Sequence, residues 1–348
     1  MATATDVYLG NPNLKKAGTE IQFTKKQVQE WIKCKEDPLY FALNYIQIIS
    51  LDEGLVPFSM YDFQKEIMMD FHNNRFNIAK LPRQTGKSTT VVAYLLHYAI
   101  FNDSVNIGIL ANKASTAREL LGRLQLAYEN LPKWMQHGIL VWNKGNVELE
   151  NGSKILAAST SASAVRGMSF NILFLDEFAF VPNHVAEQFF ASVYPTITSG
   201  KSTKVIIIST PNGMNMFYKL WHDAERGKNE YTTTEVHWSQ VPGRDANWKA
   251  QTIANTSERQ FVQEFECEFL GSVDTLISAS KLRTMVYEDP LHASKGLHTY
   301  EEPMEGHQYV ITVDVSRGVN NDYSASVSYT HLRAHETPEH LVCRVLRE

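Results

Sequence analysis

Two short motifs constrain what this chain can fold into more than any other feature of its sequence. The first, Gln84-Thr85-Gly86-Lys87-Ser88-Thr89, follows a short apolar stretch and opens a helix-like run. The second is the apolar stretch 172–175, which ends in the adjacent carboxylates Asp176 and Glu177. A strand, a glycine-containing loop and a helix, followed later by a buried strand with an acidic end, are typical of an α/β nucleotide-binding fold.

The residue types in these motifs match the chemistry of ATP hydrolysis. Backbone N–H groups at a helix N-terminus face an anion, the Lys87 ammonium neutralises phosphate charge, and the Ser88 hydroxyl is a ligand for Mg²⁺. Asp176 would hold the same Mg²⁺ directly or through water, and Glu177 would orient or deprotonate the attacking water. Leu81 stands where the usual pattern has its first glycine, so the loop is a variant form.

Composition sets broader limits. A chain of 348 residues favours two domains, or one domain and part of another. The net charge of −5 argues against a generally basic surface but leaves a local DNA-binding face open. The three cysteines, Cys34, Cys267 and Cys343, are far apart and odd in number, which fits reduced thiols with a packing role. No apolar run or signal pattern predicts a membrane segment, so we expect a soluble, intracellular protein.

The N-terminal part predicts three helices. Residues 1–20 are polar and contain Gly and Pro, so we expect them to be poorly ordered. Thr24 would cap a helix that starts at Lys25, and a second helix would follow Pro38. Apolar positions recur at helical spacing in 61–71.

From residue 76 the pattern alternates between strands and helices. Strands are expected at 76–81, 105–110, 171–175 and 204–209, with helices at 88–101, 113–131 and around 185–194. The Asn151-Gly152 dipeptide predicts a hairpin, interpreted as a local insertion. Residues 216–270 read as mostly helical, 272–306 as a linker and 309–314 as a new strand. This alternation predicts a P-loop NTPase with a RecA-like, doubly wound, mostly parallel sheet and a small helical subdomain.

The segment 328–348 differs in character from the rest. His331, His335 and His340 suggest zinc, but the His following His335-Glu336 comes five residues later and Pro338 would break the helix that such a site requires. The segment also resembles the translated sequencing-adaptor tail that ends many environmental reading frames. We therefore expect it to be foreign or disordered.

Three motifs together carry a family resemblance: Pro82–Ser88, Phe174–Phe180 and Ser209–Gly213. With them the chain resembles, over about residues 25–327, the large terminase subunit of tailed bacteriophages of the T-even-like type. The resemblance implies an N-terminal ATPase that packages double-stranded DNA into a procapsid and a C-terminal RNase H-like nuclease that cuts concatemers. The implied cofactors are ATP and Mg²⁺.

Carried over to this sequence, the resemblance makes Gln84, Thr85, Gly86, Lys87, Ser88 and Thr89 the phosphate-binding loop. Arg83 becomes a cis-acting arginine beside the γ-phosphate, Asp176 the Mg²⁺ partner and Glu177 the catalytic carboxylate. A planar, permanently charged guanidinium suits phosphoryl oxygens. The alternative is that Arg83 is merely solvated near the loop.

Two further motifs have implied roles and plain alternatives. Phe63 and Gln64 match an adenine-binding element, although Phe63 also fits a core position of its helix. Ser209, Thr210 and Asn212 belong to a coupling motif that senses the γ-phosphate, although the same residues would form a strand-ending turn. The loop 161–167 carries Arg166, which could serve a neighbouring subunit or contact DNA.

The C-terminal strand matches the opening of the terminase nuclease, with Asp314 as one Mg²⁺ ligand and Asp322 nearby. Such a centre needs three or four carboxylates around two metal ions, and the others are missing, so this chain is not expected to cleave DNA. The predicted division is as follows: 1–59, helical and part of ATPase subdomain II; 60–215, the ATPase core; 216–275, the rest of subdomain II; 276–306, a linker; 307–327, the truncated start of the nuclease; and 328–348, the tail.

The resemblance also implies partners: phage DNA, a portal protein, a small terminase subunit and the procapsid. We expect a ring of copies when docked, a monomer in isolation, no membrane, and a location in the host cell cytoplasm. A superfamily-2 DNA helicase shares the loop and the Asp-Glu pair, but it would need a second RecA-like domain, which 216–310 does not predict. A loop that binds nucleotide only for assembly would not require Glu177.

Overall fold

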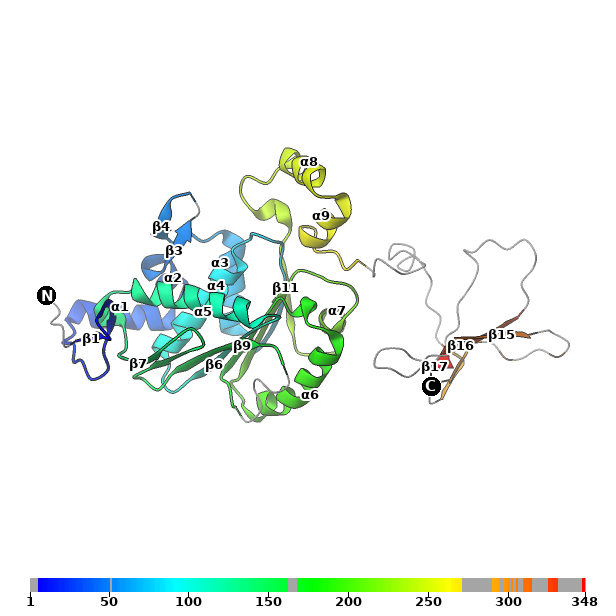
Figure 1. Ribbon diagram of the computed structural model, residues 1–348, viewed down its shortest axis with the longest axis horizontal. Helices are drawn as coiled ribbons and strands as arrows, with labels where there is room; N and C mark the ends of the chain where they lie inside the picture. The colour runs from blue at the N-terminus through cyan, green and yellow to red at the C-terminus, as the bar shows by residue number, and fades with distance from the viewer. Residues whose placement is uncertain are drawn as a thin grey trace. The chain divides into compact units, whose positions relative to one another are not determined.

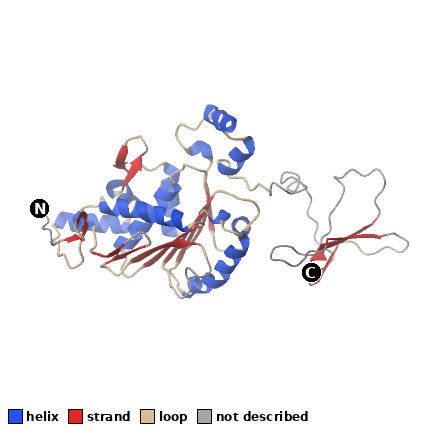
Figure 2. Cartoon of the chain, in the orientation of Figure 1, coloured by secondary structure: helices blue, strands red, loops and turns tan. Residues whose placement is uncertain are grey.

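The computed structural model divides the chain into two compact units, residues 1–275 and 276–348, each of which is described by itself. It describes residues 6–270 apart from 51 and 162–167, together with 290–294, 297–300, 302, 305, 309–314, 325–330 and 346–347. The first unit is built on one large sheet with helices on both faces (Figures 1 and 2).

The central sheet has eight strands in the order β12-β5-β11-β10-β6-β9-β8-β7. Neighbouring strands from β12 to β9 run parallel, whereas β8 and β7 are antiparallel to the strands beside them. The strands are β5 (Phe76–Lys80), β6 (Asn106–Ala111), β7 (Ile139–Trp142), β8 (Asn146–Leu149), β9 (Lys154–Ser159), β10 (Ile172–Asp176), β11 (Lys204–Ser209) and β12 (Thr232–Glu235). This confirms the predicted doubly wound, mostly parallel fold.

The central strands are apolar because both of their faces are covered. Alternate residues of β10 enter two different cores: Phe174 joins one, whereas Leu173 and Leu175 join the other. The first core lies under α3 (Asp62–Asn73), α4 (Lys87–Phe101) and α5 (Ala114–Glu129), and the second under α6 (Asn183–Ser199) and α7 (Met216–Glu225). Continuous burial on two faces explains why these strands read as unbroken apolar runs.

Two N-terminal helices pack into the first of these cores. They are α1 (Lys25–Glu36) and α2 (Pro38–Tyr45). Thr24 forms the predicted N-cap of α1 in a capping box with Gln27, and the Asp37 side chain caps α2. Between α2 and α3 lies a hairpin of β3 (Gln47–Ser50) and β4 (Gly54–Pro57). No helix within the described ranges combines the length and the apolar character that a bilayer crossing requires.

Two expectations about the first unit were wrong. Residues 7–15 are ordered as a hairpin of β1 (Val7–Tyr8) and β2 (Asn11–Lys15), which buries Leu14. The Asn151-Gly152 hairpin is confirmed between β8 and β9, but it is not a local insertion. Strand β9 pairs in parallel with β6, so this hairpin extends the central sheet.

Residues 216–270 contain a strand that the sequence analysis did not anticipate. Strand β12 forms the edge of the central sheet beside β5. It is followed by the short helices α8 (Ala246–Asn255) and α9 (Glu258–Glu264). Three-residue 3₁₀ turns are η1 (Lys133–Met135), η2 (Phe178–Phe180) and η3 (Trp238–Gln240). The finer division of 1–275 into subdomains stays a prediction.

The second unit contains two small antiparallel sheets. One is a hairpin of β13 (His292–Ser294) and β14 (Leu297–Thr299), and the other joins β15 (Tyr309–Asp314), β16 (Ala325–Thr330) and β17 (Leu346–Arg347). The strand expected at 309–314 is confirmed as β15. Parts of the tail belong to β16 and β17, so it is not disordered throughout. The tail histidines, His331, His335 and His340, lie outside the described residues.

Candidate active site

The phosphate loop connects the end of β5 to the start of α4. Gly86 precedes the helix with a φ of +70°, and Gln84 also has a positive φ, +58°. The Thr85 hydroxyl donates to the Pro82 carbonyl at 3.0 Å, and the Leu81 N–H donates to the Ser209 carbonyl at 3.2 Å. The loop therefore reaches the helix N-terminus in the tight conformation that an anion-binding turn needs.

The Gln64 side chain supports this loop from α3. Its Nε2 donates to the Thr85 carbonyl at 2.8 Å, and its Oε1 accepts from the Tyr61 N–H at 2.9 Å. Phe63 is buried, with its ring tilted against that of Tyr61. Gln64 thus has a structural role that its sequence pattern did not indicate, and the predicted adenine contact stays a prediction for both residues.

A cavity of about 600 Å³ opens over the loop. It is lined by residues from the end of α2, β3, the phosphate loop, the first half of α4 and α5: Ile46, Gln47, Ile48, Ile49, Gln84, Thr85, Gly86, Lys87, Ser88, Thr89, Val92, Arg123, Leu126 and Ala127. Arg123 was not anticipated. Its only signal in the sequence is its place on the polar face of an amphipathic helix.

The carboxylates Asp176 and Glu177 stand at the end of β10. Asp176 is buried, and its Oδ1 has no hydrogen-bond partner among the described residues. Burial raises the pKa of Asp176 to about 6, against the opposing attraction of the Lys87 ammonium. Glu177 has a φ of +49°, where the chain turns out of the strand.

These groups fit a magnesium ion that is held together with a nucleotide. A buried carboxylate oxygen without a partner is a ready ligand for a hard cation, and Mg²⁺ usually takes only one or two carboxylates beside phosphate oxygens. Within the described ranges, no three His, Cys, Asp or Glu side chains form a metal-binding cluster.

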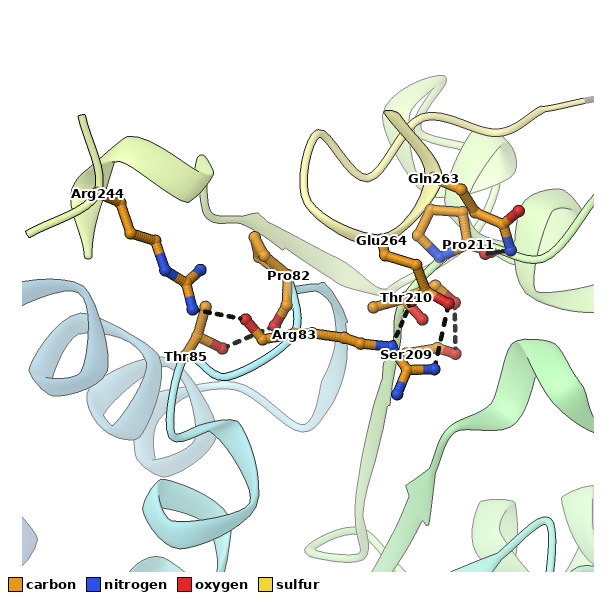
Figure 3. Close-up of polar contacts among 9 residues, drawn as sticks. All are labelled: Pro82, Arg83, Thr85, Ser209, Thr210, Pro211, Arg244, Gln263 and Glu264. Atoms are coloured by element: carbon orange, nitrogen blue, oxygen red, sulfur yellow. Dashed lines mark hydrogen bonds and ion pairs between the residues drawn. The ribbon is translucent and has the colours of Figure 1, made fainter. Parts of the chain in front are cut away.

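Arg83 is held by a carboxylate that the sequence analysis missed. Its guanidinium donates to Glu264 through Nε at 2.8 Å and Nη2 at 3.1 Å, and its backbone N–H donates to the Glu264 carbonyl at 3.0 Å (Figure 3). The hydrogen bonds to Glu264 raise the pKa of Arg83. Arg83 is therefore not merely solvated beside the loop.

The Ser209–Gly213 turn is connected to the strand-end carboxylates. The Ser209 hydroxyl accepts from the Ala179 N–H at 3.1 Å and donates to the Thr210 carbonyl at 2.7 Å. The Asn212 amide donates to the Ala179 carbonyl at 3.3 Å. The turn therefore contacts Ala179, which lies two residues after Glu177.

Two other predicted features cannot be joined to this site. Arg166 and the rest of 162–167 lie outside the described residues. Asp314 ends β15 in the second unit, where its backbone is paired with Ala325, and Asp322 lies outside the described residues. The nuclease assignment of Asp314 stays a prediction.

Comparisons with solved structures show the same fold in three phage proteins. An arginine-to-alanine mutant of the large terminase ATPase domain of Thermus phage P74-26 aligns with a TM-score of 0.53 at 20% identity, covering 61% of this chain and 95% of that domain. The HK97 bacteriophage large terminase gives 0.59 at 16% identity, covering 84% of this chain and 64% of that protein. The large terminase of thermophilic bacteriophage D6E gives 0.50 at 10% identity, covering 78% and 65%.

The family comparison is more specific than the fold. Residues 78–284 match the family described as terminase large subunit, T4likevirus-type, N-terminal. The match contains the phosphate loop, the Asp176-Glu177 strand end and the Ser209–Gly213 turn, and it covers more than half of the chain. This chain therefore belongs to the T4-like family of terminase large subunits.

Proposed function

We propose that this chain binds and hydrolyses ATP to drive double-stranded phage DNA into a procapsid. The observation that carries the proposal is the pairing of two groups at one end of the sheet. Lys87 opens α4 beneath the cavity, and it lies near enough to Asp176 to lower the pKa of that buried carboxyl. A cationic loop beside a carboxylate with a free oxygen suits a nucleotide and its divalent cation.

The roles follow from this arrangement. Lys87 and the N-terminus of α4 bind the phosphates, while Ser88 and Asp176 hold Mg²⁺, which neutralises charge on the phosphoryl oxygens. Glu177 orients the attacking water and accepts its proton. The adenine ring binds beside Phe63 and Gln64, and Thr89 extends the loop contacts.

Arg83 stabilises the transition state in this proposal, and Glu264 controls when it does so. The Nε–H and Nη2–H groups that bind Glu264 cannot bind a γ-phosphate at the same time. A γ-phosphate that takes this pair of donors therefore competes with Glu264 for Arg83. Ser209, Thr210 and Asn212 carry the nucleotide state onward through the turn.

The partners are those of a packaging motor: phage DNA, a portal protein, a small terminase subunit and a procapsid, in the host cell cytoplasm. Copies of the chain form a ring when docked, and Arg166 acts on a neighbouring copy or on DNA. Asp314 contributes one metal ligand to a nuclease. The match of residues 78–284 to the T4-like terminase family favours the motor over a helicase.

Two variants test the ATPase. Glu177→Gln should abolish turnover and leave nucleotide affinity nearly unchanged, because it replaces the carboxylate that acts as the base by a neutral amide of the same shape. Lys87→Ala should weaken binding itself. ATP turnover and the affinity for ATPγS are measured for both, with the exposed residue change Glu187→Gln on α6 as a control. Wild-type turnover by Glu177→Gln would refute the assignment.

A further inference from the structure

Arg244 reaches the phosphate loop from the segment between η3 and α8. Its Nη2 donates to the carbonyl oxygen of Arg83 at 3.0 Å and to that of Gln84 at 3.1 Å. Figure 3 shows the guanidinium directed at the backbone of the loop, on the far side of Arg83 from Glu264. One guanidinium nitrogen thus binds two consecutive carbonyl groups of the loop.

These carbonyl groups belong to the most constrained part of the loop. Gln84 has a φ of +58°, a conformation that side chains other than glycine adopt at a cost. For backbone N–H groups to converge on an anion, the neighbouring carbonyl groups must turn away from it. A cation that binds those carbonyl groups therefore favours the anion-accepting form of the loop.

The surroundings of Arg244 hold it in this position. Its guanidinium lies over the ring of Trp248 at 4.7 Å and over that of Phe265 at 5.6 Å. Its Nη1 is buried and has no hydrogen-bond partner within the described ranges. The Trp248 and Phe265 rings lie at 87° to each other, so contact with both holds the guanidinium in place and leaves its donors for the loop carbonyls.

We propose that Arg244 is a positioning residue that fixes the phosphate loop in its anion-binding conformation by holding the Arg83 and Gln84 carbonyl groups. This inference rests on the proposed binding of a nucleotide at the loop. It concerns affinity rather than chemistry, since Arg244 acts through the backbone and not on the reacting atoms. Lysine cannot replace it, because an ammonium lacks the planar guanidinium that contacts both rings while it donates to the two carbonyl groups.

The test compares Arg244→Lys with Arg259→Lys, the same change at an exposed position on α9. We expect Arg244→Lys to raise the Kd for ATPγS and the KM for ATP about tenfold, as expected for the loss of a charge-assisted hydrogen bond, with little change in kcat. Arg259→Lys should match wild type. In a Gln84→Gly background, Arg244→Lys should reduce the affinity much less than it does in the wild-type background. Glycine adopts a positive φ without support from the arginine.

Three outcomes would overturn the inference. The first is that Arg244→Lys and Arg259→Lys have the same Kd while Lys87→Ala no longer binds ATPγS. The proposed function would then stand and only this inference would fail. Another is a tenfold loss that Gln84→Gly does not relieve, since Arg244 would then act by packing alone. If Arg244→Lys does not fold, Trp248→Leu removes the supporting ring instead, and an unchanged Kd would contradict the proposal. A wild-type chain that binds no nucleotide refutes the proposed function itself.

Discussion

Gln64 lies so close to Gly86 that a Cβ atom on that glycine would stand 2.4 Å from the Gln64 Nε2. The same Nε2 donates to the Thr85 carbonyl. The contact fixes the spacing between the N-terminal end of α3 and the phosphate loop, and it requires glycine at position 86 for reasons of space as well as of backbone angle.

Gly86→Ala should therefore destabilise the protein by roughly 2 kcal/mol. About half comes from a left-handed φ on a residue with a side chain, and the rest from displacing the Gln64 amide. The matched control is Gly122→Ala on the exposed face of α5, where an added Cβ meets nothing within 4 Å. That change should stabilise the helix by up to about 1 kcal/mol. Urea unfolding of the two variants measures the contrast, and equal effects would contradict the prediction.

Glu264→Gln should strengthen the binding of ATPγS. The change weakens the competing partner of Arg83 while keeping an acceptor in place. Because the Arg83 side chain is 52% exposed, the ion pair is worth at most about 1 kcal/mol, so the gain in affinity is limited to about fivefold. Glu258→Gln, at the exposed start of α9, is the control. Weaker binding by Glu264→Gln would show that the pair serves the nucleotide-bound state instead.

We expect the free energy of unfolding to decrease in acid because of His97. Its Nε2 is hydrogen-bonded to the Cys34 carbonyl at 2.8 Å, and burial lowers the pKa of His97 to about 4 despite the opposing effect of that hydrogen bond. Below pH 6.5 the His97 side chain is protonated in the unfolded chain but stays neutral in the folded chain until the pH approaches 4. Stability therefore falls as the pH drops from about 6.5 to about 4, by roughly 3 kcal/mol in total for this group.

His97→Gln keeps an N–H donor and does not titrate, so it should flatten this part of the pH profile. Urea unfolding at pH 7.5 and 4.5 gives the slope, and the exposed His184→Gln provides the reference. Burial lowers the pKa of His72 and His137 as well, so some slope remains in the variant. A variant slope equal to that of wild type would show that His97 is not a source of the acid sensitivity.

A fragment of residues 1–275 should fold and bind ATPγS like the full chain. The reason is that this unit contains the whole central sheet, its helices, Arg244 and Glu264. A fragment of residues 60–215 should fail to fold, because it lacks β12 and the N-terminal helices that share the first core. Circular dichroism and nucleotide titration check both fragments, and a stable 60–215 fragment would contradict the prediction.

The sequence predicted those features whose signals are local. A few neighbouring residues are enough to predict the apolar strands β5, β10 and β11 and the hairpin at Asn151-Gly152. The phosphate loop and its carboxylates are equally local, since their chemistry requires particular residues at fixed spacings.

Features that depend on distant pairing were not predictable in this way. The carboxylate that binds Arg83 lies 181 residues along the chain, and the Arg244 contacts to the loop span 160 and 161 residues. Strand β12 reads Thr-Thr-Thr-Glu, which has no apolar pattern and becomes a strand only because β5 offers it an edge. The parallel pairing of β9 with β6 was not predicted either, because it joins residues that are distant in the sequence.

The end of α9 touches two motifs with consecutive residues. Gln263 donates to the Pro211 carbonyl at 3.2 Å, and Glu264 binds Arg83 (Figure 3). Both contacts are made by side chains of adjacent residues, so a displacement of the end of α9 moves the partner of Arg83 and the partner of the Pro211 carbonyl at the same time. A change at the phosphate loop and a change at the Ser209–Gly213 turn therefore both act on the same short helix end.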